Sequence, residues 1–302
     1  MKRAVRCDSL SLTGRQDGSM KEDFRGKKVA VIGLGLMGGS FAAKLREIGC
    51  FVIGINRTKE VAEEAVRKGM ADSADPEEIR NAEIVIFCTP EKGTISFIQD
   101  HGDLLPEDGI LTDIQGVKNG YMERIRTILP KGIDFISAHP MCGREGAGIE
   151  RADGSIFENA NYVIIQNPEN KEENIEKIRQ MAGALGASHV PVVSEEEHDR
   201  AIAYTSDLTH VIAAALMNSL SYDEDTKSFI GGSFKDETRV ADNNEHLWSS
   251  LFLSNRGKLL TEIDRFEASL AALKEGIEEE DEGKIQDFLK EAGRRRREMM
   301  ES

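Results

Sequence analysis

Three glycines in one short loop carry the clearest chemical signal in the sequence. Gly33, Gly35 and Gly38 follow directly after the apolar run KVAVI at residues 28–32 and precede a segment with helical spacing. The first glycine permits a tight turn, the second lets the backbone approach a pyrophosphate, and the third lets helix and strand pack closely. The N–H groups that begin such a helix attract phosphate charge. We therefore predict a dinucleotide site formed by Gly33, Gly35, Leu36, Met37, Gly38 and Gly39.

The residues after the next apolar run bear on which dinucleotide is bound. Residues 51–55 are followed by Asn56, Arg57 and Thr58. A carboxylate at the first position would bind the adenosine ribose 2′-hydroxyl and select NAD. Asn56 has no charge that repels a 2′-phosphate, and Arg57 has the donors to bind one. We predict NADP in preference to NAD, with NAD bound through Asn56 as the alternative. Thr58 and Thr89 complete the predicted cofactor site.

Downstream of the loop, His139 has a side chain suited to proton transfer. It lies at the carboxyl end of the apolar run 135–137. This is the edge at which open α/β sheets bind their ligands, and an imidazole accepts protons near neutral pH. The residue type and position also fit a structural histidine, so the sequence alone leaves both roles open.

The last third of the chain contains two more candidate groups. Ser206 and His210 are four residues apart and share one face of a predicted helix. Arg239 follows a glycine-led loop together with Thr238, and its guanidinium has the geometry to bind a carboxylate. A contact between helices is the alternative role for His210. The alternative for Arg239 is a surface ion pair with a nearby aspartate, Asp236 or Asp242.

The elements that must position these residues alternate along the first two thirds of the chain. Apolar runs without polar alternation occur at 28–32, 51–55, 84–88, 110–113, 135–137, 162–166 and 190–193, separated by helical patterns. This is typical of a doubly wound α/β domain whose parallel sheet is covered on both faces. After Val193 the patterns are helical. We predict an irregular extension at 1–26, a Rossmann-type dinucleotide-binding domain at 27–193, and an all-α domain at 194–302 that begins with one long helix from Glu195 to Leu220.

Composition narrows the class of protein. The 302 residues contain 39 Lys and Arg against 54 Asp and Glu, a formal net charge of −15. An acidic surface disfavours nucleic acid as a partner but admits a small anionic substrate in a local basic pocket. The apolar runs are too short for a membrane span. Four scattered cysteines without a CxxC pair are typical of reduced thiols in the cytoplasm, and no spacing predicts a metal site.

Several motifs, in this order, resemble the prephenate dehydrogenase family and its arogenate and cyclohexadienyl relatives. The resemblance covers the chain from Lys27 to about Glu291. It implies a Rossmann domain followed by a helical dimerisation domain, a homodimer, and oxidative decarboxylation of a small anionic cyclohexadiene substrate in tyrosine biosynthesis, with hydride transfer to NAD(P)⁺. The motifs are GLGLMGGS at 33–40, TDIQGVK at 112–118, HPMCGRE at 139–145, IFENANYVI at 156–164, SDLTH at 206–210, FKDETRVA at 234–241, and Trp248 with Asn255.

The resemblance also implies roles for single residues. His139 accepts the hydrogen bond of the substrate hydroxyl, and Arg239 binds a substrate carboxylate. His210 lines the pocket from the helical domain and Glu145 lies at its edge. Ser206 and Thr238 are assigned to the same substrate site.

Two positions depart from the family pattern. Gly116 stands where the family often has a serine that orients the catalytic histidine, and we expect Gln115 or a water molecule to take over that role. Asp207 stands where the family often has a histidine, and we expect it to pair with His210. These departures leave arogenate open as the substrate. Gly116 also leaves open a regulator that binds a dinucleotide but is catalytically weak.

Overall fold

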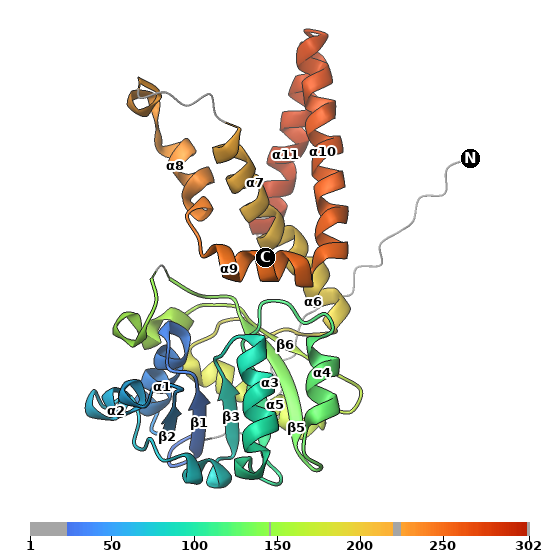
Figure 1. Cartoon of the computed structure of the whole chain (residues 1–302). Helices are drawn as coiled ribbons and strands as arrows, with labels where there is room; N and C mark the ends of the chain where they lie inside the picture. Colours follow the sequence, from blue (N-terminus) through green and yellow to red (C-terminus); the bar gives the residue numbers. More distant parts are fainter. Residues whose placement is uncertain (1–22, 145, 220–224, 301–302) are drawn as a thin grey trace.

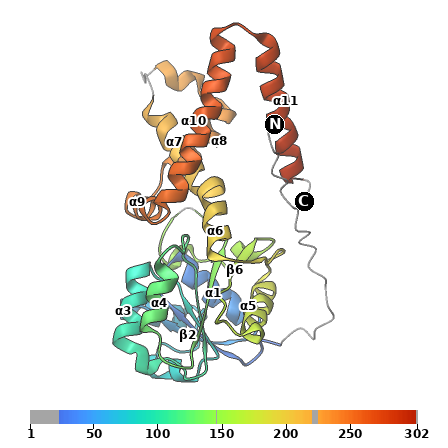
Figure 2. The same cartoon turned by 90° about the vertical axis from the view of Figure 1, so that its right-hand side faces the viewer.

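The computed structural model describes residues 23–144, 146–219 and 225–300. A sheet flanked by helices forms one part of the molecule, and a group of helices stands on one edge of that sheet (Figure 1). The view turned by 90° shows two long helices extending away from the sheet (Figure 2). The predicted fold class, a Rossmann-type α/β part followed by a helical part, is confirmed. Residues 1–22 of the predicted extension, and Glu145, lie outside the described residues.

The sheet has seven strands in the order β2-β1-β3-β4-β5-β6-β7. Strands β1 to β5 are parallel to one another, which brings their carboxyl ends to one edge. The bounds are β1 Lys28–Ile32, β2 Phe51–Ile55, β3 Ile84–Phe87, β4 Ile110–Asp113, β5 Asp134–Pro140, β6 Tyr162–Ile165 and β7 Val192–Val193.

The expectation of a wholly parallel sheet was wrong at β6. This strand runs antiparallel to β5, with Ser137 opposite Ile165 and Pro140 opposite Tyr162. A parallel neighbour needs a crossover that returns the chain to the opposite edge. In the described part of residues 141–161 the only helical elements are two short 3₁₀ turns, so the connection returns to the sheet without a crossover helix. Because β6 is buried on both faces, its apolar run did not distinguish the two directions.

Helices cover both faces of the sheet, as the sequence predicted. Successive strand residues alternate between two cores, so that Val29 and Val31 face one layer while Ala30 and Ile32 face the other. The first layer is formed by α1 Leu36–Glu47, α2 Lys59–Arg67 and α5 Glu172–Leu185. The second layer is formed by α3 Glu91–His101 and α4 Tyr121–Ile128.

The helical part begins with α6 Glu195–Ile202. Its first turn is fixed by a capping box in which Ser194 and Glu197 satisfy each other's backbone N–H groups. The predicted long helix is interrupted by a π turn at Ala203–Asp207 and continues as α7 Leu208–Asn218. Leu220 lies outside the described residues. The remaining helices are α8 Gly232–Thr238, α9 Glu245–Ser254, α10 Arg256–Glu278 and α11 Glu282–Met300. No described helix has both the length and the apolar character needed to cross a bilayer.

The start of α1 is held against the segment that follows β5. The buried rings of Phe41 and Phe157 pack with centroids 4.4 Å apart. The Ser40 hydroxyl accepts a hydrogen bond from the Asp153 backbone N–H at 2.9 Å. The glycine loop therefore lies beside residues 149–157.

Replacing the ring at this contact is expected to destabilise the fold. Phe41→Ala removes a fully buried ring, and such truncations cost about 3 to 5 kcal/mol. The measurement is equilibrium urea unfolding at fixed protein concentration. Glu60→Ala, at an exposed position of α2, is the control and should change stability by less than about 0.5 kcal/mol. Equal stability of the two variants would contradict the described packing.

Candidate active site

The glycine loop has a backbone that accepts no side chain at two of its positions. Gly33 has a φ of +95°, and a Cβ there would lie 2.8 Å from the Cys88 carbonyl oxygen. A Cβ on Gly38 would lie 1.8 Å from the Gly33 carbonyl oxygen. Gly35 faces open space, with nothing within 4 Å of the equivalent point. No side chain caps the start of α1, so its first N–H groups point into this opening. The loop therefore fits a pyrophosphate.

The predicted ribose residues lie beside this loop. The Asn56 side chain accepts a hydrogen bond from the Leu34 N–H at 3.0 Å and donates one to the Thr58 carbonyl at 3.1 Å. Arg57 and Thr58 are exposed at the start of α2. Thr89 lies against Gly33 from the other side. The predicted cofactor residues thus surround one helix start, and no carboxylate occupies the position that selects NAD.

His139 lies near the carboxyl end of β5. Its Nδ1 is 3.0 Å from Nε2 of His198, which lies on α6. Burial lowers the pKa of His139 well below its ordinary value of 6.5, and the charges of Lys118 and His198 lower it further. The imidazole is therefore neutral at pH 7 and available as a proton acceptor.

A buried ion pair supports the strand end that carries His139. The Lys118 ammonium is 3.1 Å from a carboxylate oxygen of Asp113, and both side chains are 0% exposed. Asp113 also accepts hydrogen bonds from the Ser137 hydroxyl and the Ala138 N–H, at 2.6 and 3.1 Å. Lys118 donates to the Ala138 carbonyl at 2.7 Å. The TDIQGVK segment therefore fixes the backbone next to His139.

Gln115 does not take the orienting role that the sequence suggested. Its side-chain amide donates to the Thr89 carbonyl at 2.6 Å, and the bond that orients His139 comes from His198 instead. At Gly116 a Cβ would lie 4.0 Å from Nε2 of His139 and 3.3 Å from Leu251 of α9. A serine at this position would reach the imidazole, whereas glycine offers it no side chain.

The helical part contributes a group of packed aromatic rings. The ring of His210 stacks on Trp248 of α9 at a centroid distance of 3.4 Å, and Trp248 packs against Phe252. His210 Nδ1 donates to the Ser206 carbonyl at 3.0 Å. Ser206 therefore positions His210 through its backbone. Burial lowers the pKa of His210, and the nearby charge of Arg239 lowers it further.

Arg239 faces a cavity of about 610 Å³ between the two parts of the chain. The other walls come from the segment after β5, where Arg144 and Arg151 add positive charge. Glu150 and Asp153 add negative charge, with Asp153 paired to Arg144 at 2.9 Å, so the lining has three arginines against two carboxylates; Ala152 completes it. Ala152 also lies against Gly39 of α1, so the cavity borders the cofactor loop. The Thr238 hydroxyl donates to the Phe234 carbonyl within α8, which leaves it only an acceptor for any ligand.

Asp207 does not pair with His210. Its buried carboxylate accepts a hydrogen bond from the Asn255 side chain at 2.8 Å, which makes it a contact between helices. The extra residue of the π turn changes which side chains face inward, and sequence spacing on a regular helix does not anticipate this. Burial raises the pKa of Asp207 from 3.8 to about 6.

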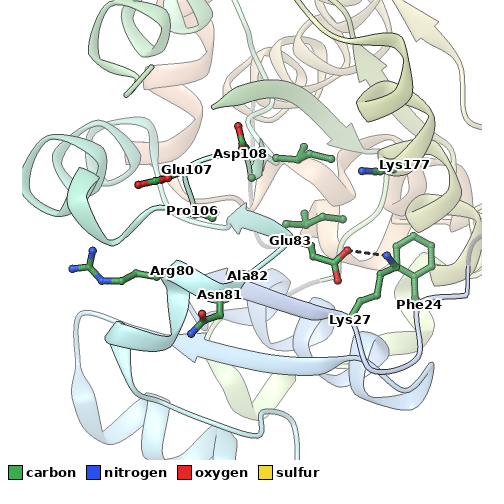
Figure 3. A pocket seen from close by; sticks show the side chains of 13 residues that line it. Phe24, Lys27, Arg80, Asn81, Ala82, Glu83, Pro106, Glu107, Asp108 and Lys177 are labelled. Carbon is green, nitrogen blue, oxygen red and sulfur yellow. Dashed lines mark hydrogen bonds and ion pairs between the residues drawn. The ribbon is translucent and has the colours of Figure 1, made fainter. Parts of the chain in front are cut away.

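A second cavity lies at the opposite edge of the sheet (Figure 3). Its volume is about 290 Å³, and Lys27 and Glu83 form an ion pair of 2.8 Å across its wall. It is lined by the starts of β3 and β4, away from His139 and the glycine loop. Among the described residues, no group of three His, Cys, Asp or Glu side chains is placed to hold a metal ion.

Sequence reasoning missed two residues that hold the site together, His198 and Asp199. It included Lys118 and Asn255 among the family motifs but gave them no role. His198 and Asp199 follow three glutamates at the start of α6. The signal available was a histidine–aspartate pair directly after a helix cap. It was concealed because the acidic run has the composition of a solvated helix start.

A glycine loop fitted to a pyrophosphate and a neutral imidazole at the carboxyl edge define a dinucleotide-dependent dehydrogenase site. Family models agree. Residues 41–190 match the model described as prephenate dehydrogenase, nucleotide-binding domain, and residues 194–291 match prephenate dehydrogenase, dimerization domain. The chain belongs to the prephenate dehydrogenase family, and the predicted oxidoreductase class is confirmed.

Individual relatives extend over most of the chain. It is 28% identical over 275 residues to a prephenate dehydrogenase of Bacillus subtilis, covering 87% of this chain and 74% of that protein. It is 27% identical to a cyclohexadienyl dehydrogenase of Zymomonas mobilis, covering 89% and 95%.

Two solved structures share the fold along their whole length. The first is the prephenate dehydrogenase from A. aeolicus in complex with hydroxyphenyl propionate and NAD⁺. It has a TM-score of 0.82 and 27% identity, covering 92% of this chain and 100% of that one. The second is the Synechocystis arogenate dehydrogenase, with a TM-score of 0.80 and 26% identity, covering 90% and 100%.

The raised pKa of Asp207 predicts a pH-dependent gain in stability for Asp207→Asn. The folded-state pKa of about 6 exceeds the ordinary 3.8. Wild type therefore loses stability as pH rises from about 4 to 6, by up to about 3 kcal/mol. Asparagine keeps an acceptor for Asn255 without this penalty. Urea unfolding of both proteins at pH 4, 5, 6 and 8 measures the difference, which should grow up to pH 6 and then level off. A difference independent of pH would contradict the buried environment.

Proposed function

We propose that this protein catalyses the oxidative decarboxylation of prephenate to 4-hydroxyphenylpyruvate, with NAD(P)⁺ as the oxidant, in tyrosine biosynthesis. One observation carries the proposal: the neutral imidazole of His139 lies at the sheet edge that also carries the glycine loop, with the Arg239 cavity bordering that loop. An imidazole that is uncharged at neutral pH can take a proton from an alcohol, and the basic cavity suits an anionic substrate.

The substrate ring carries a hydroxyl on one carbon and a carboxylate on the carbon opposite. A nicotinamide bound at the glycine loop would supply the hydride acceptor for the hydroxyl-bearing carbon. Nε2 of His139, the ring nitrogen near Gly116, accepts the hydroxyl proton. Arg239 binds a substrate carboxylate, and the stacked rings of His210 and Trp248 form the wall of the pocket. Loss of CO₂ then makes the ring aromatic, so the step is effectively irreversible.

NADP is the favoured cofactor. Asn56 presents no carboxylate at the end of β2, and its amide is held by Leu34 and Thr58. The exposed guanidinium of Arg57 lies next to it and has the donors for a 2′-phosphate. NAD bound through Asn56 is the alternative.

The functional unit is a homodimer formed through the helical part. The matching family model is described as a dimerization domain. Large apolar side chains are exposed on three helices of this part: Leu216 on α7, Leu253 on α9, and Leu260 and Leu270 on α10. Such a set is typical of a surface that a second copy covers. The cytoplasmic location suggested by the cysteines stays a prediction.

The reaction is tested by following NAD(P)H formation by the purified full chain, with prephenate and with arogenate. Wild type should turn over prephenate, and His139→Asn should lower kcat by at least about 100-fold, because a general base is lost. His246→Asn, at an exposed position of α9, is the matched control and should keep wild-type activity.

Three outcomes would change the proposal. Faster turnover of arogenate would identify that compound as the substrate. Absence of turnover on either compound would favour a regulator that binds a dinucleotide. Full activity of His139→Asn would remove the imidazole from the mechanism.

Arg57→Ala tests the cofactor assignment. A charged hydrogen bond contributes about 1.5 to 3 kcal/mol, so KM for NADP should rise at least about tenfold while KM for NAD changes less than about threefold. Arg67→Ala, at the exposed end of α2, is the matched control. Equal effects on both cofactors would show that Arg57 does not contact a phosphate.

A further inference from the structure

Behind His139, two side chains continue a line of hydrogen bonds into the helical part. Nδ1 of His139 is 3.0 Å from Nε2 of His198, and Nδ1 of His198 is 2.7 Å from a carboxylate oxygen of Asp199. His198 and Asp199 are 3% and 0% exposed. His198 therefore bridges the His139 imidazole on β5 and the buried carboxylate of Asp199, the next residue of α6.

The surroundings of Asp199 fix the direction of these bonds. Its carboxylate accepts the backbone N–H of Lys118 at 3.0 Å and that of Asn119 at 2.7 Å. An ionised carboxylate only accepts hydrogen bonds, so Nδ1 of His198 must carry the hydrogen. The neutral His198 ring then has a bare Nε2, which can only accept. Nδ1 of His139 must therefore be the donor in the next bond, and Nε2 of His139 is left without a hydrogen.

We propose that His198 and Asp199 are positioning residues that hold His139 in the Nδ1–H tautomer, so that its bare Nε2 is the base for the substrate hydroxyl. This inference rests on the proposed function, which makes His139 the base. In it, His198 and Asp199 take over the orienting role of the serine that the family often has at the position of Gly116. Nε2 is the ring nitrogen near Gly116, whereas Nδ1 is the one that contacts His198.

The same hydrogen bonds remain in place when His139 is protonated. Once Nε2 has accepted a proton, both ring nitrogens of His139 carry hydrogens and Nδ1 still donates to His198. The Lys118 cation opposes this charge, and burial opposes it further. The Asp199 carboxylate is the anion at the end of the line and compensates part of the charge, which favours proton transfer.

Further hydrogen bonds connect these positioning residues to helix α9. The Asn255 side chain, at the junction of α9 and α10, donates both to the Asp199 carbonyl at 2.9 Å and to Asp207 at 2.8 Å. The Asn119 side chain donates to the Ser254 carbonyl at the end of α9. Helix α9, which carries Trp248 and Leu251, is thus fixed to the residues that orient His139.

Asp199→Asn is the sharpest test because it reverses the hydrogen bonds while conserving shape. Only the Oδ2 position accepts from both backbone N–H groups, Asn119 at 2.7 Å and Lys118 at 3.3 Å, so the amide oxygen is favoured there. The amide NH₂ then takes the Oδ1 position, which lies 2.7 Å from Nδ1 of His198. The donor and acceptor roles along the line then invert, and His139 is held with its hydrogen on Nε2. We expect kcat to fall at least about 100-fold, with KM for substrate and cofactor within about threefold of wild type.

His198 offers a rescue pair. In His198→Gln the amide oxygen can take the place of Nε2 and accept from His139, so kcat should stay within about tenfold of wild type. His198→Ala removes the acceptor and should lose at least about 100-fold. Glu196→Gln is the matched control, since it removes a carboxylate from the same helix at an exposed ion pair with Lys258, and it should behave as wild type.

A spectroscopic readout separates this inference from the reaction itself. Long-range ¹H–¹⁵N spectra of histidine-labelled full chain at pH 8, assigned with His139→Asn, should show the Nδ1–H form of His139 in wild type. The Nε2–H form should appear in Asp199→Asn. A wild-type Nε2–H form, or an unchanged kcat in Asp199→Asn, would overturn the inference. Absence of turnover by wild type would contradict the proposed function, while the spectra would still decide the tautomer.

Discussion

The hydrogen bond between His139 and His198 joins the two parts of the molecule at the atom where the proposed chemistry takes place. One ring comes from the last residues of a sheet strand and the other from the first helix of the helical part. Orientation of the base therefore depends on the contact between the two parts. The same contact encloses the substrate side, because α9 lies over Gly116 and is fixed to α6 through Asn255.

This arrangement requires several charged groups to lie out of water. Asp113, Lys118 and Asp199 are all fully buried. A buried charge is strongly unfavourable unless hydrogen bonds and an opposite charge compensate it. Here each is compensated: Lys118 by Asp113 and a carbonyl, and Asp199 by two backbone N–H groups and His198. Replacing a buried ion pair with well-packed apolar side chains is often neutral or stabilising, so buried charge is weak evidence for stability. What these groups provide here is a network of hydrogen bonds around one imidazole.

The connection from β5 to β6 explains how cofactor and substrate residues come together. Because the chain reverses at the carboxyl edge, residues 149–153 stay beside the start of α1 and residues 150–153 form a wall of the Arg239 cavity. A crossover helix would have carried this segment to the opposite edge. The antiparallel strand is therefore a condition for the basic cavity to border the start of α1, where Ala152 meets Gly39.

The sequence by itself determined the elements and the cofactor loop. Strand and helix periodicity are local, and the spacing of the glycines at 33, 35 and 38 is a local motif. The contact that excludes a side chain at Gly38 comes from Gly33 in the same turn. It also indicated His139, because a strand end is a local feature. Tertiary structure alone decided which partners orient that imidazole, the antiparallel direction of β6, and the pairing of Asp207 with Asn255 instead of His210. These depend on contacts between residues up to 59 positions apart, and on a π turn that changes the helix face. Local patterns contain no information on such contacts, because hydrogen-bond direction between buried polar groups is set only when the two parts of the chain meet.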